Sequence, residues 1–176
     1  MAQEPVFTRS GAELVTVLFR DFDAPVWEVF KAWTTASLLQ QWWGPHFTTI
    51  DICTFESRVG GHYRIDMVGE EDQRYPIYGI IRSYLEHERL VWQVCLDEHP
   101  ESWRGIFRPR GTHLENAPAV WEYNFAFEAI PDGTRVIVTS TFPVEEDVLI
   151  MLAAGASVVW GESFEKLDDL LSKSQI

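Results

Sequence analysis

The feature that most constrains the fold is a two-residue alternation of apolar and polar side chains that runs from about His46 to Phe142. Successive side chains on a β-strand point to opposite faces, so this period is typical of strands. Turn-forming residues such as Pro131-Asp132-Gly133 interrupt it. The pattern predicts strands at 47–56, 62–68, 75–84, 89–97, 119–129 and 134–142. No helical pattern separates them, so we expect an antiparallel meander rather than a parallel sheet.

Helical spacing flanks this region. Residues 13–20 alternate like a first strand, and Pro25 then suits the first turn of a helix with an apolar face. A second short helix follows and ends at Gly44-Pro45. The segment from Glu145 to Lys173 is again helical, with one apolar face formed by Trp160, Phe164, Leu167 and Leu171. The expected class is α+β: a curved antiparallel sheet covered by a long C-terminal helix, with two short helices after the first strand.

The length of 176 residues suits a single domain over 1–176, with a core of about 13–172. Fourteen basic and 27 acidic side chains give a net charge of −13, which disfavours nucleic acid and anionic membranes as partners. No apolar run is long enough to span a bilayer, so we expect no membrane insertion. Cys53 and Cys95 lie in apolar alternating segments, which favours reduced thiols and a cytoplasmic protein. A homodimer is possible.

The sequence contains none of the common motifs that bind nucleotides or metals or that supply an activated catalytic nucleophile. The five histidines are scattered over strand starts and loops, whereas zinc needs three or four converging ligands. We therefore expect neither a metal nor a cofactor, and a binding protein is favoured over an enzyme.

Aromatic residues recur on one side of a predicted strand, at Trp121, Tyr123, Phe125 and Phe127. Buried strands often have this pattern, so a packed hydrophobic core explains each residue individually. The chain contains eight tryptophans and five tyrosines, however, and their polar atoms either find partners in the core or line a ligand cavity. Both interpretations stay open.

Two charged groups also allow two interpretations. His62, Arg64 and Asp66 share one face of a strand, either as a solvated outer face or as a titratable trio. The long loop at about 98–118 contains several positively charged residues in an otherwise acidic protein. It is either an ordinary solvated loop or a lid over an anionic ligand. Its residues of interest are Trp103, Arg104, Arg108, Arg110 and His113.

Ordered motifs along the chain resemble the activator of heat-shock-protein-90 ATPase C-terminal-domain-like family, within the SRPBCC (START/pollen-allergen-like) superfamily. They span about Leu14 to Leu171 and comprise Asp23-Ala24-Pro25, Trp42-Trp43-Gly44-Pro45, Gly60-Gly61, Gly79, Glu88-Arg89-Leu90-Val91, Gly133-Thr134-Arg135 and Trp160 through Leu167. The resemblance implies a helix-grip fold with a deep apolar cavity between the sheet and the C-terminal helix. It carries over no catalytic residues, and typical relatives look shorter in the 98–118 loop.

Three functions follow as hypotheses. The first is binding of a hydrophobic small molecule in the cavity, a lipid-transfer-like role, with a wall formed by Trp43, Tyr63, Tyr78, Trp92, Trp121, Tyr123 and Trp160. The alternative is an enzyme of the polyketide-cyclase or hydrolase type that uses the same cavity, with Glu122, Arg64 and His62 as candidates. A second alternative, a chaperone co-factor-like module, follows from the family name alone.

Overall fold

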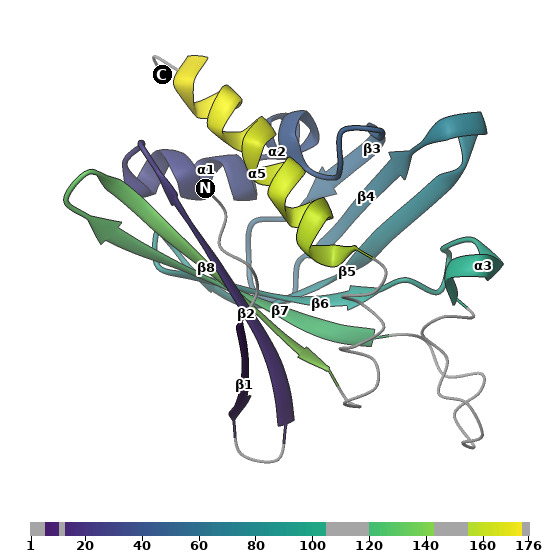
Figure 1. Ribbon diagram of the computed structural model, residues 1–176, viewed down its shortest axis with the longest axis horizontal. Helices are drawn as coiled ribbons and strands as arrows, with labels where there is room; N and C mark the ends of the chain where they lie inside the picture. Colours follow the sequence, from purple (N-terminus) through teal and green to yellow (C-terminus); the bar gives the residue numbers. More distant parts are fainter. Residues whose placement is uncertain (1–5, 11–12, 105–119, 143–154, 174–176) are drawn as a thin grey trace.

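The structure, a computed structural model, describes residues 6–10, 13–104, 120–142 and 155–173. One curved sheet wraps around a long helix, and two short helices lie beside that helix (Figure 1). In chain order the elements are β1 Val6–Ser10, β2 Glu13–Phe22, α1 Val26–Thr34, α2 Ala36–Trp42, β3 Thr49–Phe55, β4 His62–Val68, η1 Glu70–Asp72, β5 Arg74–Leu85, β6 Arg89–Cys95, α3 Glu101–Arg104, β7 Val120–Ile130, β8 Gly133–Phe142 and α5 Ala156–Lys173.

The sheet contains eight strands within the described residues, in the order β1-β2-β8-β7-β6-β5-β4-β3. Every neighbouring pair is antiparallel, and the strands from β3 to β8 form a continuous meander. This confirms the expected α+β helix-grip fold. The six strands of the predicted meander are all present, and their ends differ from prediction by at most two residues.

Three differences from the predicted elements concern short segments or chain ends. Strand β1 was not predicted, because five residues are too few to establish an alternation. The predicted loop at 98–118 contains the short helix α3 at Glu101–Arg104, and its residues 105–118 lie outside the described residues. Helix α5 spans Ala156–Lys173, and residues 145–154 of the predicted helix lie outside the described residues.

The centre of the molecule is a cluster of large rings between the sheet and the helices. Trp33 on α1 is fully buried and contacts the rings of Phe22, Trp42, Phe125, Phe127 and Phe164, with centroid distances from 4.4 to 6.4 Å. Burial of such side chains is the largest favourable contribution to folding. The predicted faces of α5 and β7 both point into this core, with all eight of their apolar residues buried.

Candidate functional site

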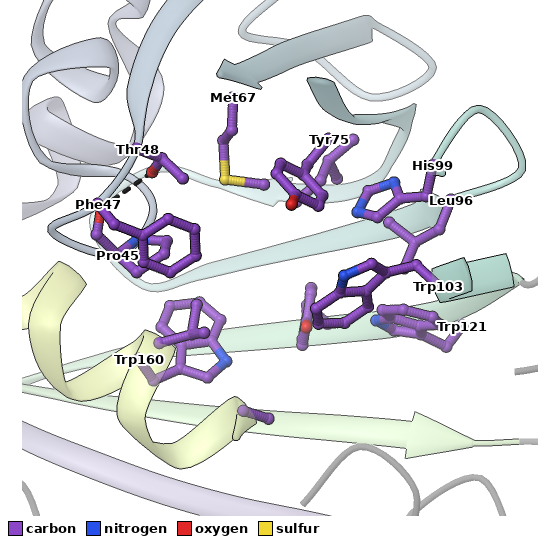
Figure 2. Close-up of a pocket in the computed structure, with 14 residues that line it drawn as sticks. Pro45, Phe47, Thr48, Met67, Tyr75, Leu96, His99, Trp103, Trp121 and Trp160 are labelled. Atoms are coloured by element: carbon purple, nitrogen blue, oxygen red, sulfur yellow. Dashed lines mark hydrogen bonds between the residues drawn. The ribbon is translucent and has the colours of Figure 1, made fainter. Parts of the chain in front are cut away.

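A pocket with a volume of about 120 Å³ lies where the first turn of α5 faces strands β4 to β7. Its wall also includes the segment after α2 and residues in and just before α3 (Figure 2). The pocket therefore occupies one end of the space that the helix and sheet enclose, while aromatic side chains fill the middle. The resemblance implied a deep cavity, and the void is smaller because rings around Trp33 and Trp92 occupy much of the interior.

The alternation of the strands determines which side chains line the pocket. On β4 and β5, Met67 and Tyr75 are directly paired in the register, and Ile77 follows on the same face. Strand β7 contributes Trp121 and Tyr123 from its inward face. Since a strand presents every second residue to one face, the floor of the pocket is almost entirely apolar.

The segment after α2 forms one side of the pocket with Pro45, Phe47 and Thr48. Gly44 permits this close approach: it has φ of +84°, and a Cβ there would lie 2.8 Å from Met67 Sδ. The Thr48 hydroxyl donates a hydrogen bond of 2.9 Å to the carbonyl of Pro45, which holds the turn closed. The chemistry of the Gly-Pro pair thus shapes this wall.

Polar groups on the outer side of α5 hold the same segment against the helix. Lys166 Nζ donates to the carbonyl of Trp43 at 3.2 Å, and partial burial lowers the pKa of this ammonium group. The backbone N–H of His46 donates to Glu162 at 2.9 Å, and the His46 ring lies 3.0 Å from Glu165 Oε2. These contacts fix the rim of the pocket relative to the helix.

Opposite this segment, a turn after β6 brings His99 and Trp103 over the sheet (Figure 2). The backbone N–H of His99 donates a hydrogen bond of 3.0 Å to the carbonyl of Leu96, which closes the turn. Tyr75, His99 and Trp103 form a trio of edge-to-face rings, with centroid distances of 5.8, 6.1 and 6.1 Å. Figure 2 shows these three rings on one side of the pocket, across from Phe47 and Trp160.

The described wall of the pocket contains no Lys, Arg, Asp or Glu. Burial lowers the pKa of His99 to about 4, although hydrogen bonding with the backbone of Pro76 acts in the opposite direction. Burial also raises the pKa of Tyr123 to about 12, partly offset by hydrogen bonds with the side chains of Trp121 and Trp160. Both groups are therefore uncharged near neutral pH, and the pocket presents aromatic surface with a few neutral polar atoms.

The seven residues predicted as a ligand wall fall into three groups. Trp121, Tyr123 and Trp160 line the pocket. Trp43, Tyr63 and Trp92 are buried in the packed core beside it, where Trp43 contacts Trp160 at a centroid distance of 5.3 Å. Tyr78 lies on the other face of the sheet, with its hydroxyl bonded to Asp97 and the Arg64 guanidinium 5.6 Å from its ring centroid.

The residues considered for an enzyme do not line the pocket. His62 and Glu122 are exposed on the outer face of the sheet. Arg64 is on that face too, with Nε 2.7 Å from Asp66 and Nη2 2.6 Å from Glu98. Asp66 is buried and paired with Arg64, so it does not fit the solvated outer face that the alternation suggested. These positions offer no support for catalysis by the three residues in the pocket.

Sequence reasoning missed His99, Tyr75 and Phe47 among the pocket residues. Tyr75 could have been found from the alternation, because it shares a face of β5 with Ile77 and Gly79, whereas Tyr78 falls on the opposite face. His99 and Phe47 lie outside the regular strands, and no periodic signal marks which way a loop side chain points. Of the positively charged loop, Trp103 lines the pocket and the residues from 105 to 119 lie outside the described part.

Other site types find little basis in the described residues. They contain no group of three or more His, Cys, Asp or Glu side chains arranged to hold a metal ion. None of the described helices combines the length and apolarity needed to cross a membrane. Cys53 and Cys95 are free and half-buried, and burial raises the pKa of the Cys53 thiol to about 11, so this thiol is a poor nucleophile at neutral pH.

Solved structures with the same fold come from several bacteria. A protein of Rhodobacter sphaeroides has a TM-score of 0.77 and 18% identity, with coverage of 96% of this chain and 98% of its own. A protein of Mycobacterium smegmatis gives 0.76 and 18%, covering 98% of both chains. A protein of Nitrosomonas europaea gives 0.75 and 22%, covering 93% and 97%. Among curated proteins, no significant sequence match was found.

The sequence pattern of one protein family matches most of this chain. It matches residues 23–172, which include both short helices, the meander and most of α5. The motifs at Asp23-Ala24-Pro25 and Trp42-Trp43-Gly44-Pro45 fall inside this match. The chain therefore belongs to the activator of Hsp90 ATPase homolog 1-like protein family.

Proposed function

We propose that this protein binds a hydrophobic small molecule in the pocket between α5 and strands β4 to β7. The observation that carries the proposal is a largely aromatic pocket, with no charged side chain in its described wall, next to a closely packed core. Protein interiors contain few voids larger than a water molecule, and ligand sites are concave and mostly apolar, so an apolar void of this size supports the assignment. The helix-grip fold, which generally supports ligand binding, is consistent with the proposal.

The rim of the pocket supports the same function. Phe47 is 58% exposed although it is a large apolar side chain, and it lies on the pocket wall. An exposed apolar side chain at the edge of an apolar pocket favours capture of a hydrophobic compound from water.

Two adjacent valines on α5 provide a matched test. Val159 lines the pocket, whereas Val158 is 61% exposed. The protein is purified from its own host for native mass spectrometry, and it is then screened by thermal shift against aromatic, fatty and polyketide-like compounds. We expect a bound molecule or a saturable rise in melting temperature. V159F, which fills the pocket, should abolish either signal, and V158F should preserve it. Equal binding by both variants, or no ligand from either approach, would contradict the proposal.

A further inference from the structure

A row of side chains crosses three strands on the outer face of the sheet and leads to the wall of the pocket. Arg64 on β4 is paired in the register with Tyr78 on β5, and Tyr78 is paired with Cys95 at the end of β6. The chain then leaves the sheet and forms the segment 96–103, the wall turn. Its pocket residues are Leu96, His99 and Trp103. The row of side chains therefore ends where the wall turn begins.

Two acidic residues tie the wall turn to this row. The Tyr78 hydroxyl donates a hydrogen bond to Asp97. Two nitrogens of Arg64, Nη2 and Nη1, donate to the two carboxylate oxygens of Glu98 at 2.6 and 3.3 Å. Such bidentate pairs are among the stronger side-chain contacts. The hydrogen bond with Asp97 raises the pKa of Tyr78, and that with Glu98 raises the pKa of Arg64, so both donors keep their protons at neutral pH.

The Arg64 guanidinium is itself held in place from the sheet. Its Nε lies 2.7 Å from Oδ1 of Asp66, a carboxylate that is 5% exposed, and its Nη2 donates to Oδ2 at 3.2 Å. Loss of the partner of a buried charge is strongly unfavourable, so Asp66 keeps the guanidinium at this position. The guanidinium also lies 5.6 Å from the centroid of the Tyr78 ring, within the range of cation–π contacts. Glu98 therefore binds to a group that is already oriented.

Neighbouring residues of the wall turn contact opposite sides of the sheet. Leu96 and His99 are buried in the pocket wall, with exposed fractions of 5% and 6%. Asp97 and Glu98, which lie between them in the sequence, are exposed and bonded to the outer face. A contact that holds these two carboxylates therefore also sets where the inner side chains lie.

From this geometry we propose that Arg64 and Tyr78 are positioning residues for the pocket, which hold the wall turn where its aromatic side chains close the void. Neither residue lines the pocket, and no covalent step is involved. The inference rests on the proposed function, since it concerns the wall of the same pocket. It also gives a structural role to the charged face around Arg64 and Asp66.

The titration of His99 reports the position of the wall turn without any ligand. Burial lowers its pKa to about 4, whereas an imidazole in water titrates near 6.5. Between pH 7.5 and pH 5 the NMR signals of the wild-type imidazole should stay nearly constant, and H99F identifies them by their absence. In D97A/E98A, which releases both ties, we expect the pKa of His99 to rise by at least one unit. Loss of two neighbouring carboxylates would by itself lower the pKa of a histidine, so a rise means exposure to water.

A second ion pair of the sheet provides the matched control. Asp51 lies 2.7 Å from Arg74 and is 50% exposed, close to the 47% of Glu98, but it is not part of the wall turn. D51A should leave the titration of His99 unchanged. E98A and Y78F each break one tie, and each should raise the pKa of His99 less than the double variant does. The other four histidines should titrate as in the wild type in every variant, which shows that the rest of the fold is intact.

Titration calorimetry with toluene connects the wall turn to binding. We expect D97A/E98A to weaken toluene binding about fivefold and D51A to leave it unchanged. An unchanged pKa of His99 in the double variant, or an equal rise in D51A, would overturn the positioning role while the pocket stands. A risen pKa with unchanged toluene affinity would show that the wall turn does not close the void. If His99 titrates as expected but neither toluene nor the V159F comparison reveals a ligand, the proposed function fails and the hold on the wall turn stands.

Discussion

The space between the sheet and α5 has two ends, built from the same kinds of side chain but filled to different extents. Around Trp33, rings from α1, α2, β7 and α5 contact one another and leave no exposed surface on that indole. At the other end Trp103, Trp121 and Trp160 surround a void. The comparison shows that aromatic content does not determine whether a region becomes core or pocket. The two ends differ in the segments that cover the sheet.

The cover at the packed end consists of two helices with complementary faces. The indole N–H of Trp42 donates a hydrogen bond of 3.0 Å to the carbonyl of Ala32. This contact holds α2 against α1, with Trp33 and Trp42 both directed inward. Among the described residues, the pocket end is covered by the first turn of α5, the turn at residues 44–48 and α3, which has four residues. Short segments present fewer large side chains toward the sheet, so space remains between them.

The largest effect should come from truncation at the packed end. Trp33→Ala should lower the free energy of unfolding by about 3–5 kcal/mol, because it removes a fully buried ring and leaves a cavity that its neighbours cannot fill. Trp27→Ala on the same helix is the matched control, since that ring is 43% exposed, and it should cost less than about 1 kcal/mol. Urea unfolding of both variants measures the difference. Similar losses of unfolding free energy in the two variants would show that this end is not closely packed.

A smaller effect should arise from His99 at the pocket end, as a dependence of stability on pH. Burial lowers the pKa of His99 to about 4 in the folded protein, against about 6.5 when unfolded. Below pH 6.5 the unfolded chain therefore binds a proton that the folded chain does not. The associated stability is present at pH 7 and is lost as the pH falls toward 4.

The pH effect can be isolated by comparison with a variant. Between pH 7 and pH 5 the wild type should lose about 2 kcal/mol more stability than His99→Phe, which keeps a ring but cannot titrate. All carboxylates and the other four histidines are common to both proteins, so their contributions cancel. Parallel stability profiles for the two proteins would mean that water reaches the His99 ring in the folded state.

These two ends also differ in how far the sequence predicts them. The packed end follows from periodicity, because the helical spacing of Phe164, Leu167 and Leu171 and the alternation on β7 identify most of its residues. The pocket end depends on turns, and periodicity does not specify the direction of His99 or Phe47. Tyr78 illustrates the remaining ambiguity within strands, because a shift of one residue on β5 exchanges the two faces.

The smallest effect on stability should come from the rim of the pocket. Phe47 is 58% exposed, so Phe47→Ala should change the free energy of unfolding by less than about 0.5 kcal/mol. The same ring lines the pocket, so its loss should weaken toluene binding by roughly two- to fivefold, as expected for part of one apolar contact surface. Val59→Ala, at a side chain 60% exposed and away from the pocket wall, should alter neither quantity. Titration calorimetry with toluene and urea unfolding on the same samples separate the two properties. A large stability loss in Phe47→Ala would mean that the pocket end is packed after all, and unchanged toluene affinity would remove Phe47 from the ligand wall.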